Sequence, residues 1–209
     1  MTRTIAIVTP ILDDWVSFAV LVEEISNLFT GSDVAFHIYA IDDGSSIPFD
    51  VDAVPLPAAS CILAIELIRL AANLGHQRAI AVGLSAIAES TVIDAVPVMD
   101  GDGQDRPVDI ALLLAASFRH PQHIVFARRA KRSESYPFRL WYGAYKLLFY
   151  ALTGQPINYG NFCLIPIAAA RRLVHMPELC NLPASIMRSR LPYTTVRQRA
   201  AAALLAGRE

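Results

Sequence analysis

Residues 97–105 read PVMDGDGQD, a short apolar run that ends in closely spaced carboxylates. If the chain stays extended, side chains alternate, so Asp100, Asp102 and Gln104 share one face. Oxygen-bearing side chains just beyond a strand suit Mg2+ or Mn2+, which share their other positions with water and substrate phosphates. The segment therefore indicates an enzyme that handles a diphosphate-bearing molecule.

Three other interpretations of this segment are weighed against a metal site. An Asp- and Gly-rich stretch is often only a solvated turn, and this alternative stays open. A calcium-binding EF-hand loop needs Gly at position six and Glu at position twelve, but Asp105 and Ala111 stand there. A dinucleotide-binding Gly-rich motif fails because Arg106 stands where its third Gly is needed.

The composition bounds the class of protein. The chain has 209 residues, enough for one domain with its own core. Apolar residues make up 54% and charged residues 18%, which excludes disorder, and the net charge of -1 gives no reason to expect nucleic acid as a partner. The three cysteines are widely spaced and form no Cys-x-x-Cys pair, so zinc and a disulfide framework are not expected. We expect reduced thiols, a cytoplasmic location, no signal peptide and no membrane span.

Apolar runs alternate with helical patterns along the first 127 residues. Strands are expected at 4–8, 34–41, 92–99 and 123–127. One helix is expected to begin at Asp13 or Asp14 and end at 30, a second to follow the turn at 73–77 and end at Glu89, and a third to cover 107–118. Residues 61–70 fit a strand or a helix. This alternation predicts an α/β fold with a mainly parallel, Rossmann-like sheet flanked by helices. Ligands of such sheets bind beyond the carboxyl ends of the strands, where both Asp42-Asp43 and Asp100-Gly101-Asp102 are expected.

The later part of the chain has a different character. After turns and a short strand at 160–165, helices are expected near 168–174 and 182–188. Residues 138–153 mix aromatic, apolar and basic side chains, which fits a helix at a membrane interface or one packed on the core. Arg128 and Arg139 belong to a basic run that is either a solvated surface or a site for anions.

Five segments, taken together and in order, resemble glycosyltransferase family 2. Within it they resemble the branch of polyprenyl-phosphate (dolichol-phosphate mannosyltransferase-like) sugar synthases. The segments are Val8-Thr9-Pro10 with Asp13-Asp14, Ile41-Asp42-Asp43-Gly44-Ser45, Asn73-Leu74-Gly75-His76-Gln77 with Ala79, residues 99–105, and Gly160-Asn161-Phe162 before Leu164-Ile165.

The resemblance implies a GT-A fold, a nucleotide-diphosphate sugar donor and Mg2+ or Mn2+ as cofactor. It also implies roles for single residues. Pro10 and Asp14 match positions that line the nucleotide base pocket, and Asp42 matches the acid that hydrogen-bonds the nucleoside, with Asp43 beside it. The metal and diphosphate cluster is matched by Asp100, Asp102 and Gln104. Arg128 and Arg139 match positions that hold the acceptor phosphate.

The resemblance also sets the expected organisation. Residues 1–209 would form a single catalytic domain, with a nucleotide-sugar half at about 1–106 and an acceptor half at about 107–209. The chain departs from the family pattern at Ala72, Gly143, Asn161 and Cys163. After Tyr193 neither the closing loop nor the membrane anchor of many members is recognisable.

The expected function is inverting transfer of a sugar from the nucleotide donor to a polyprenyl phosphate. Asp102 would neutralise the leaving diphosphate through the metal, while Arg128 and Arg139 bring the acceptor phosphate to it. Two alternatives stay open: a soluble transferase to a hydroxyl acceptor, with Asp43 or Asp105 as general base, and a catalytically silent nucleotide-binding relative. Peripheral contact with the inner face of the membrane and a homo-oligomer are further expectations.

Overall fold

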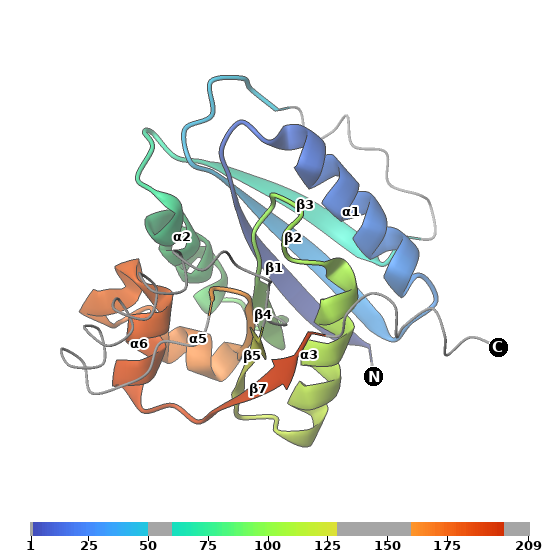
Figure 1. The fold of residues 1–209 in the computed structure, drawn as a ribbon, viewed down its shortest axis with the longest axis vertical. Coiled ribbons are helices and arrows are strands. Elements are labelled where there is room, and N and C mark those ends of the chain that lie inside the picture. Colours follow the sequence, from blue (N-terminus) through green and yellow to red (C-terminus); the bar gives the residue numbers. More distant parts are fainter. Residues whose placement is uncertain (1, 50–59, 129–159, 199–209) are drawn as a thin grey trace, which may run out of the picture.

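The computed structural model describes residues 2–49, 60–128 and 160–198, which form one seven-stranded sheet flanked by helices (Figure 1). The strands are β1 (Arg3–Ile11), β2 (Val34–Asp42), β3 (Ile62–Arg69), β4 (Ala95–Val98), β5 (Ile124–Arg128), β6 (Cys163–Pro166) and β7 (Tyr193–Arg197). The helices are α1 (Trp15–Phe29), α2 (His76–Ala88), α3 (Pro107–Arg119), α5 (Ile167–Leu173) and α6 (Leu182–Ser189), with a 3-10 turn, η2, at Pro177–Cys180.

The strand order is β3-β2-β1-β4-β6-β5-β7. β1 pairs in parallel with β2 and β4, β2 with β3, and β5 with β7. Among the strands of the described residues, only β6 runs against its neighbours, with Ala95 opposite Pro166 and Val98 opposite Cys163. The expected α/β fold with a mainly parallel sheet is therefore confirmed.

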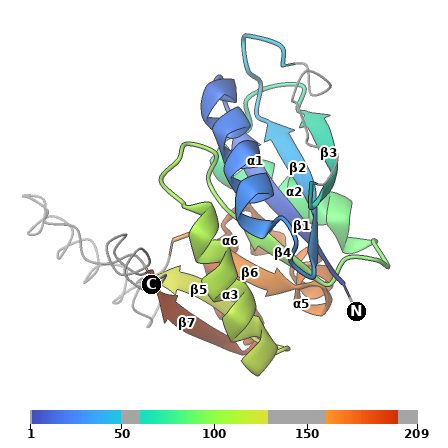
Figure 2. The same ribbon diagram turned by 90° about the vertical axis from the view of Figure 1, so that its right-hand side faces the viewer.

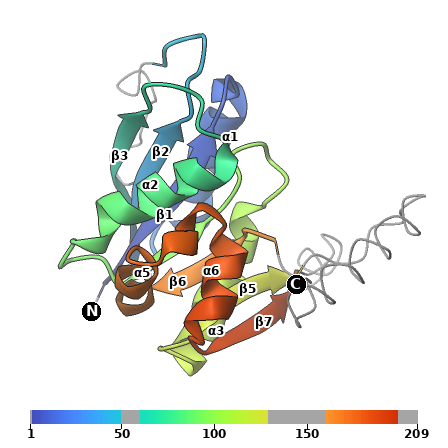
Figure 3. The ribbon, with the colours of Figure 1, turned by 90° about the vertical axis from the view of Figure 1, so that its left-hand side faces the viewer.

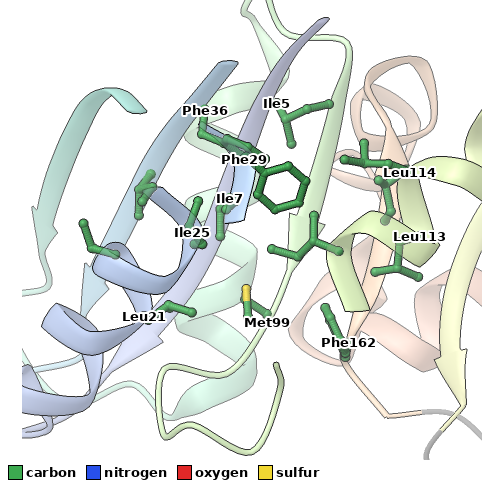
Figure 4. Close-up of a cluster of buried hydrophobic side chains, with 14 of the residues drawn as sticks. Ile5, Ile7, Leu21, Ile25, Phe29, Phe36, Met99, Leu113, Leu114 and Phe162 are labelled. Atoms are coloured by element: carbon green, nitrogen blue, oxygen red, sulfur yellow. The ribbon is translucent and has the colours of Figure 1, made fainter. Parts of the chain in front are cut away.

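Helices cover both faces of the sheet. Figure 2 shows α1 and α3 on one face, and Figure 3 shows α2, α5 and α6 on the other. Side chains alternate along β1, so Ile5 and Ile7 pack with α1 and α3 whereas Ala6 and Val8 pack with α2. Figure 4 shows Ile5 and Ile7 beside Leu21, Ile25 and Phe29 of α1. β1 is buried on both faces, which is why its sequence reads as one apolar run.

Several elements differ from the sequence expectations. Residues 61–70, left open between strand and helix, form β3 at the sheet edge. β4 begins at Ala95 rather than Val92, since residues 91–92 form a bend; Asp94, just before the strand, also accepts the Thr4 amide on its carboxylate at 2.8 Å. β7 was not expected, since its sequence YTTVR is polar and half exposed. The expectations for residues 138–153, Arg139 and Gly143 lie outside the described residues.

Parallel pairing brings three strand ends to one edge of the sheet. Ile11 stands opposite Asp42, and the Met99 amide donates to the Val8 carbonyl at 3.1 Å just after β4 ends. The loops that follow β1, β2 and β4 therefore meet, which is where such sheets bind ligands.

Candidate nucleotide and metal site

A hollow of about 180 Å3 lies at this edge of the sheet. It is lined by Pro10, Ile11, Leu12, Asp14, His76, Asp100, Gly101 and Asp102. Four of these, Pro10, Asp14, Asp100 and Asp102, are residues that the sequence assigns to the nucleotide or the metal. A larger open groove, about 770 Å3, runs between α1 and the start of α3, but contains none of the expected nucleotide-binding or metal-binding residues.

Asp100 is anchored through its backbone amide, and one of its carboxylate oxygens has no hydrogen bond. Its amide donates to Asp105 Oδ2 at 3.0 Å, and Asp105 is itself buried. Asp100 Oδ1 is buried without a hydrogen bond, and lies 3.1 Å from His76 Nε2. Such an unsatisfied buried oxygen is costly unless a proton or a cation meets it.

His76 ends a chain of side-chain hydrogen bonds that crosses from α6 to α2. The Leu182 amide donates to Gln77 Oε1 at 3.0 Å, and Gln77 Nε2 donates to Asn161 Oδ1 at 2.8 Å. Asn161 Nδ2 then lies 3.0 Å from His76 Nε2. The chain ties the loop before β6 and the start of α6 to the side chain that faces Asp100.

Negative charge around His76 raises its pKa above the ordinary value. The largest cause is the Asp100 carboxylate beside the ring, and the charges of Asp102 and Asp43 act in the same direction. Partial burial of the ring opposes them. The hollow therefore favours a positive charge at this position.

Asp102 and Gln104 do not lie as expected. Residues 101–105 form bends, with Gly103 at φ 76°, rather than the extended chain that would align Asp100, Asp102 and Gln104. Asp102 instead accepts from the Gln104 amide at 2.9 Å and from Gln104 Nε2 at 2.8 Å. Glycine-rich sequence turns the chain here, so strand alternation does not extend past β4.

Asp42 and Asp43 follow β2 but have different partners. Asp42 accepts from the Ser45 amide at 2.8 Å and so closes the turn after the strand. Asp43 accepts from the amides of Leu74 and Gly75, at 2.7 and 3.0 Å, where the chain enters α2. Asp43 and Asp105, the two candidate general bases, are thus both buried and bonded to backbone amides.

The remaining expected residues occupy separate places. Asp14 caps α1, accepting from the Ser17 amide at 3.3 Å, and also lines the hollow with Pro10. Arg128 is exposed at the carboxyl end of β5 and does not line the hollow. Arg139 lies outside the described residues.

The residues around the hollow fit a divalent cation. Asp100 Oδ1 and His76 Nε2 are an oxygen and a nitrogen donor 3.1 Å apart, and the oxygen lacks a hydrogen bond. In residues 2–49, 60–128 and 160–198, no three His, Cys, Asp or Glu side chains gather closely enough to hold a metal on their own. A cation here would complete its coordination with water and donor phosphates, as Mg2+ commonly does.

Sequence reasoning did not assign a role to His76, Gln77 or Asn161. His76 and Gln77 belong to one of the five segments that resemble the family, and Asn161 is a departure from the family pattern. The missing signal is tertiary, because residues 76 and 161 meet only when β6 pairs with β4.

Comparison with solved structures establishes the fold. Glucosyl-3-phosphoglycerate synthase from Mycobacterium tuberculosis, in complex with Mn2+, UDP-glucose and phosphoglyceric acid, matches with a TM-score of 0.59 and 15% identity, over 98% of this chain and 75% of that one. TarS from S. aureus matches with a TM-score of 0.58 and 10% identity, over 95% and 59%. The fold is thus that of GT-A glycosyltransferases.

Comparisons with protein-family models and with curated proteins give no match. No helix in the described part of the chain is long and apolar enough to cross a membrane.

Proposed function

We propose that this chain is a metal-dependent glycosyltransferase that moves a hexose from a nucleotide-diphosphate sugar. The observation that carries the proposal is the hollow at the ends of β1 and β4, where Pro10, Asp14, Asp100 and Asp102 meet. It is supported by the glucosyl-3-phosphoglycerate synthase structures, which share the fold and hold Mn2+ with UDP-glucose or UDP.

The donor would bind across this edge of the sheet. Pro10 and Asp14 would border the base, and Asp42 would hydrogen-bond the nucleoside from the end of β2. Asp43 contributes indirectly, since its carboxylate fixes the Leu74-Gly75 turn beside the hollow.

The diphosphate would lie against Asp100 and Asp102 through Mg2+ or Mn2+, with Gln104 beside them. The bound cation would neutralise the charge that builds on the leaving diphosphate. Asp105 would hold the Asp100 backbone in place during this step, because its carboxylate accepts the Asp100 amide. Gln104 reaches the cluster only by giving up its bond to Asp102.

The described residues say less about the sugar acceptor than about the nucleotide-sugar donor. We propose a polyprenyl phosphate, whose charge Arg128 and Arg139 would balance; an acceptor that is already an anion needs no general base. A hydroxyl acceptor is the second candidate, and the phosphoglyceric acid in a neighbouring structure is consistent with it. It would need a base, and both Asp43 and Asp105 already hold backbone amides.

Isothermal titration with UDP and GDP, with and without Mn2+, tests the proposal. We expect binding that requires Mn2+, and Asp100→Asn should weaken it by about a hundredfold because the unsatisfied oxygen loses its charge. Asp33→Asn, an exposed carboxylate at the start of β2, is the control. Binding without metal, or an unchanged Asp100→Asn variant, would contradict the proposal.

Flotation with vesicles that contain a polyprenyl phosphate separates the two acceptors. Co-flotation that depends on the lipid phosphate supports the first acceptor. Transfer of radiolabelled sugar to a soluble hydroxyl compound, without flotation, supports the second.

A further inference from the structure

We propose that His76 is a nitrogen ligand of the divalent cation, adjacent to Asp100. This inference rests on the proposed function and goes beyond the acidic cluster expected from the sequence. It adds a nitrogen donor from α2 to the oxygen donors that follow β4.

The distance between the two donor atoms fits one ion. His76 Nε2 and Asp100 Oδ1 are 3.1 Å apart. Two neighbouring ligands of an octahedral ion with bonds of about 2.1 Å are separated by about 3 Å. Both side chains line the same hollow, and His76 is 42% exposed there, so its ring is open to an ion arriving from solvent.

The hydrogen-bond chain behind His76 sets which of its nitrogens is free of hydrogen. The Leu182 amide can only donate, so the atom of Gln77 that faces it is the acceptor oxygen. Gln77 must then donate to Asn161 Oδ1, which leaves Asn161 Nδ2 to donate to His76 Nε2. Turning either amide around would bring two N–H groups together.

When the ring is neutral, this arrangement leaves Nε2 as the nitrogen without hydrogen, which is the form that binds metals. The nitrogen lies 3.1 Å from Asp100 Oδ1, an oxygen that has no hydrogen bond. A cation bound to both atoms would satisfy the Asp100 oxygen. The cation would compete with Asn161 for the Nε2 lone pair.

Asp102 does not account for this arrangement. Its two oxygens are bonded to Gln104, whereas the buried acceptor without a partner belongs to Asp100, on the side that faces His76. His76 is thus the donor that already stands beside the unsatisfied oxygen.

Pulsed electron paramagnetic resonance of the untagged full chain with Mn2+ and UDP tests the proposal directly. A coordinated imidazole nitrogen modulates the Mn2+ electron spin echo, and labelling histidine with 15N changes that modulation without altering the protein. We expect the modulation in the natural chain, its loss in His76→Gln and its retention in His175→Gln, an exposed histidine after α5. Mn2+ affinity should fall about tenfold to a hundredfold in His76→Gln only.

The outcomes separate this inference from the proposed function. If Mn2+ and UDP bind and Asp100→Asn prevents it, but no histidine modulation is seen or it persists in His76→Gln, His76 is not a ligand and the proposed function stands. If Mn2+-dependent binding is absent altogether, both proposals fall.

Discussion

Asp13, Asp43 and Asp105 show that carboxylates near one site can have different partners. Asp105 and Asp43 are buried and accept backbone amides, whereas Asp13 is exposed and accepts the Ser46 amide and hydroxyl at 2.7 and 2.8 Å. Asp100 alone among the carboxylates of the hollow has a buried oxygen without a hydrogen bond. Asp100 Oδ1 is therefore the oxygen of the hollow that most needs a proton or a cation as a partner.

Gly44 gives a steric prediction for the turn after β2. Its φ is 86°, and a Cβ there would lie 2.8 Å from the Asn73 amide nitrogen, a backbone atom that cannot move aside. We expect Gly44→Ala to lower the free energy of unfolding by about 3 kcal/mol, from left-handed strain and this clash. Urea denaturation measures it.

Gly31→Ala is the matched control for this substitution. Gly31 also has a positive φ, 76°, but nothing lies within 4 Å of its added Cβ. It should cost only the conformational strain, about 1 kcal/mol. Equal effects of the two substitutions would show that the approach of the Asn73 backbone is unimportant.

Asp13 gives a pH prediction. Hydrogen bonds from the Ser46 side chain and backbone lower the pKa of Asp13 below the ordinary value of an aspartate. A group with a lowered folded-state pKa stabilises the fold above its unfolded pKa, and this contribution is lost as the pH falls through the folded value. We expect Asp13→Asn to be less stable than the natural chain at pH 7, and the gap to narrow as the pH falls below the ordinary pKa of an aspartate.

Chemical denaturation of both proteins across this pH range measures the gap. Asn also tolerates the left-handed backbone at this position, φ 55°, so the comparison isolates the charge. A gap that stays constant from pH 7 to pH 2 would rule out the carboxylate as its cause.

At the level of elements, α2 is positioned by the turn before it. Its first residue is His76, its N-cap is Gly75, and no side chain caps it from within the helix. Asp43, from the end of β2, accepts the Leu74 and Gly75 amides and so joins the start of the helix to the sheet. The site geometry at His76 depends on this link.

Asp43→Ala should lower the free energy of unfolding by about 2 kcal/mol, because the Leu74 amide loses its charged acceptor and the Gly75 amide keeps only the Asn73 side-chain oxygen. Asp43→Asn should lose less, since it keeps one acceptor oxygen. Hydrogen exchange of Leu74 and Gly75 by NMR checks the cause, with faster exchange expected in both variants. Unchanged exchange there would place the effect elsewhere.

Across the whole molecule, ligand binding should stabilise the fold by mass action. With Mn2+ and UDP at about a hundred times the dissociation constant, the gain is about 2.7 kcal/mol. For a chain of this size that raises the melting temperature by about 5–10 °C. Differential scanning fluorimetry measures the shift, and Asp100→Asn should abolish it while Asp33→Asn preserves it. A shift with Mn2+ alone that persists in Asp100→Asn would indicate a cation site elsewhere.

The strands that carry the site were predictable because their cause is local. β1 and β2 are apolar runs of β-branched and aromatic residues that end in turn-forming sequence, so Asp42 could be placed at a strand end in advance. The backbone path of residues 101–105 was not predictable from the alternation of side chains along a strand, because the glycines allow several bends. The hydrogen bonds from the Asp100 amide to Asp105 and from Gln104 to Asp102 fix the bend that forms. β7 was missed because an exposed edge strand lacks the apolar pattern.

The sequence by itself determined the α/β alternation, the mainly parallel sheet and the acidic residues at the ends of β2 and β4. These follow from periodicity and from turn chemistry within a few residues. Only the tertiary structure decided which oxygen is left unsatisfied and what faces it. His76, Asn161 and Leu182 are far apart along the chain, and they meet because antiparallel β6 returns the chain beside β4, with α6 packed behind α2.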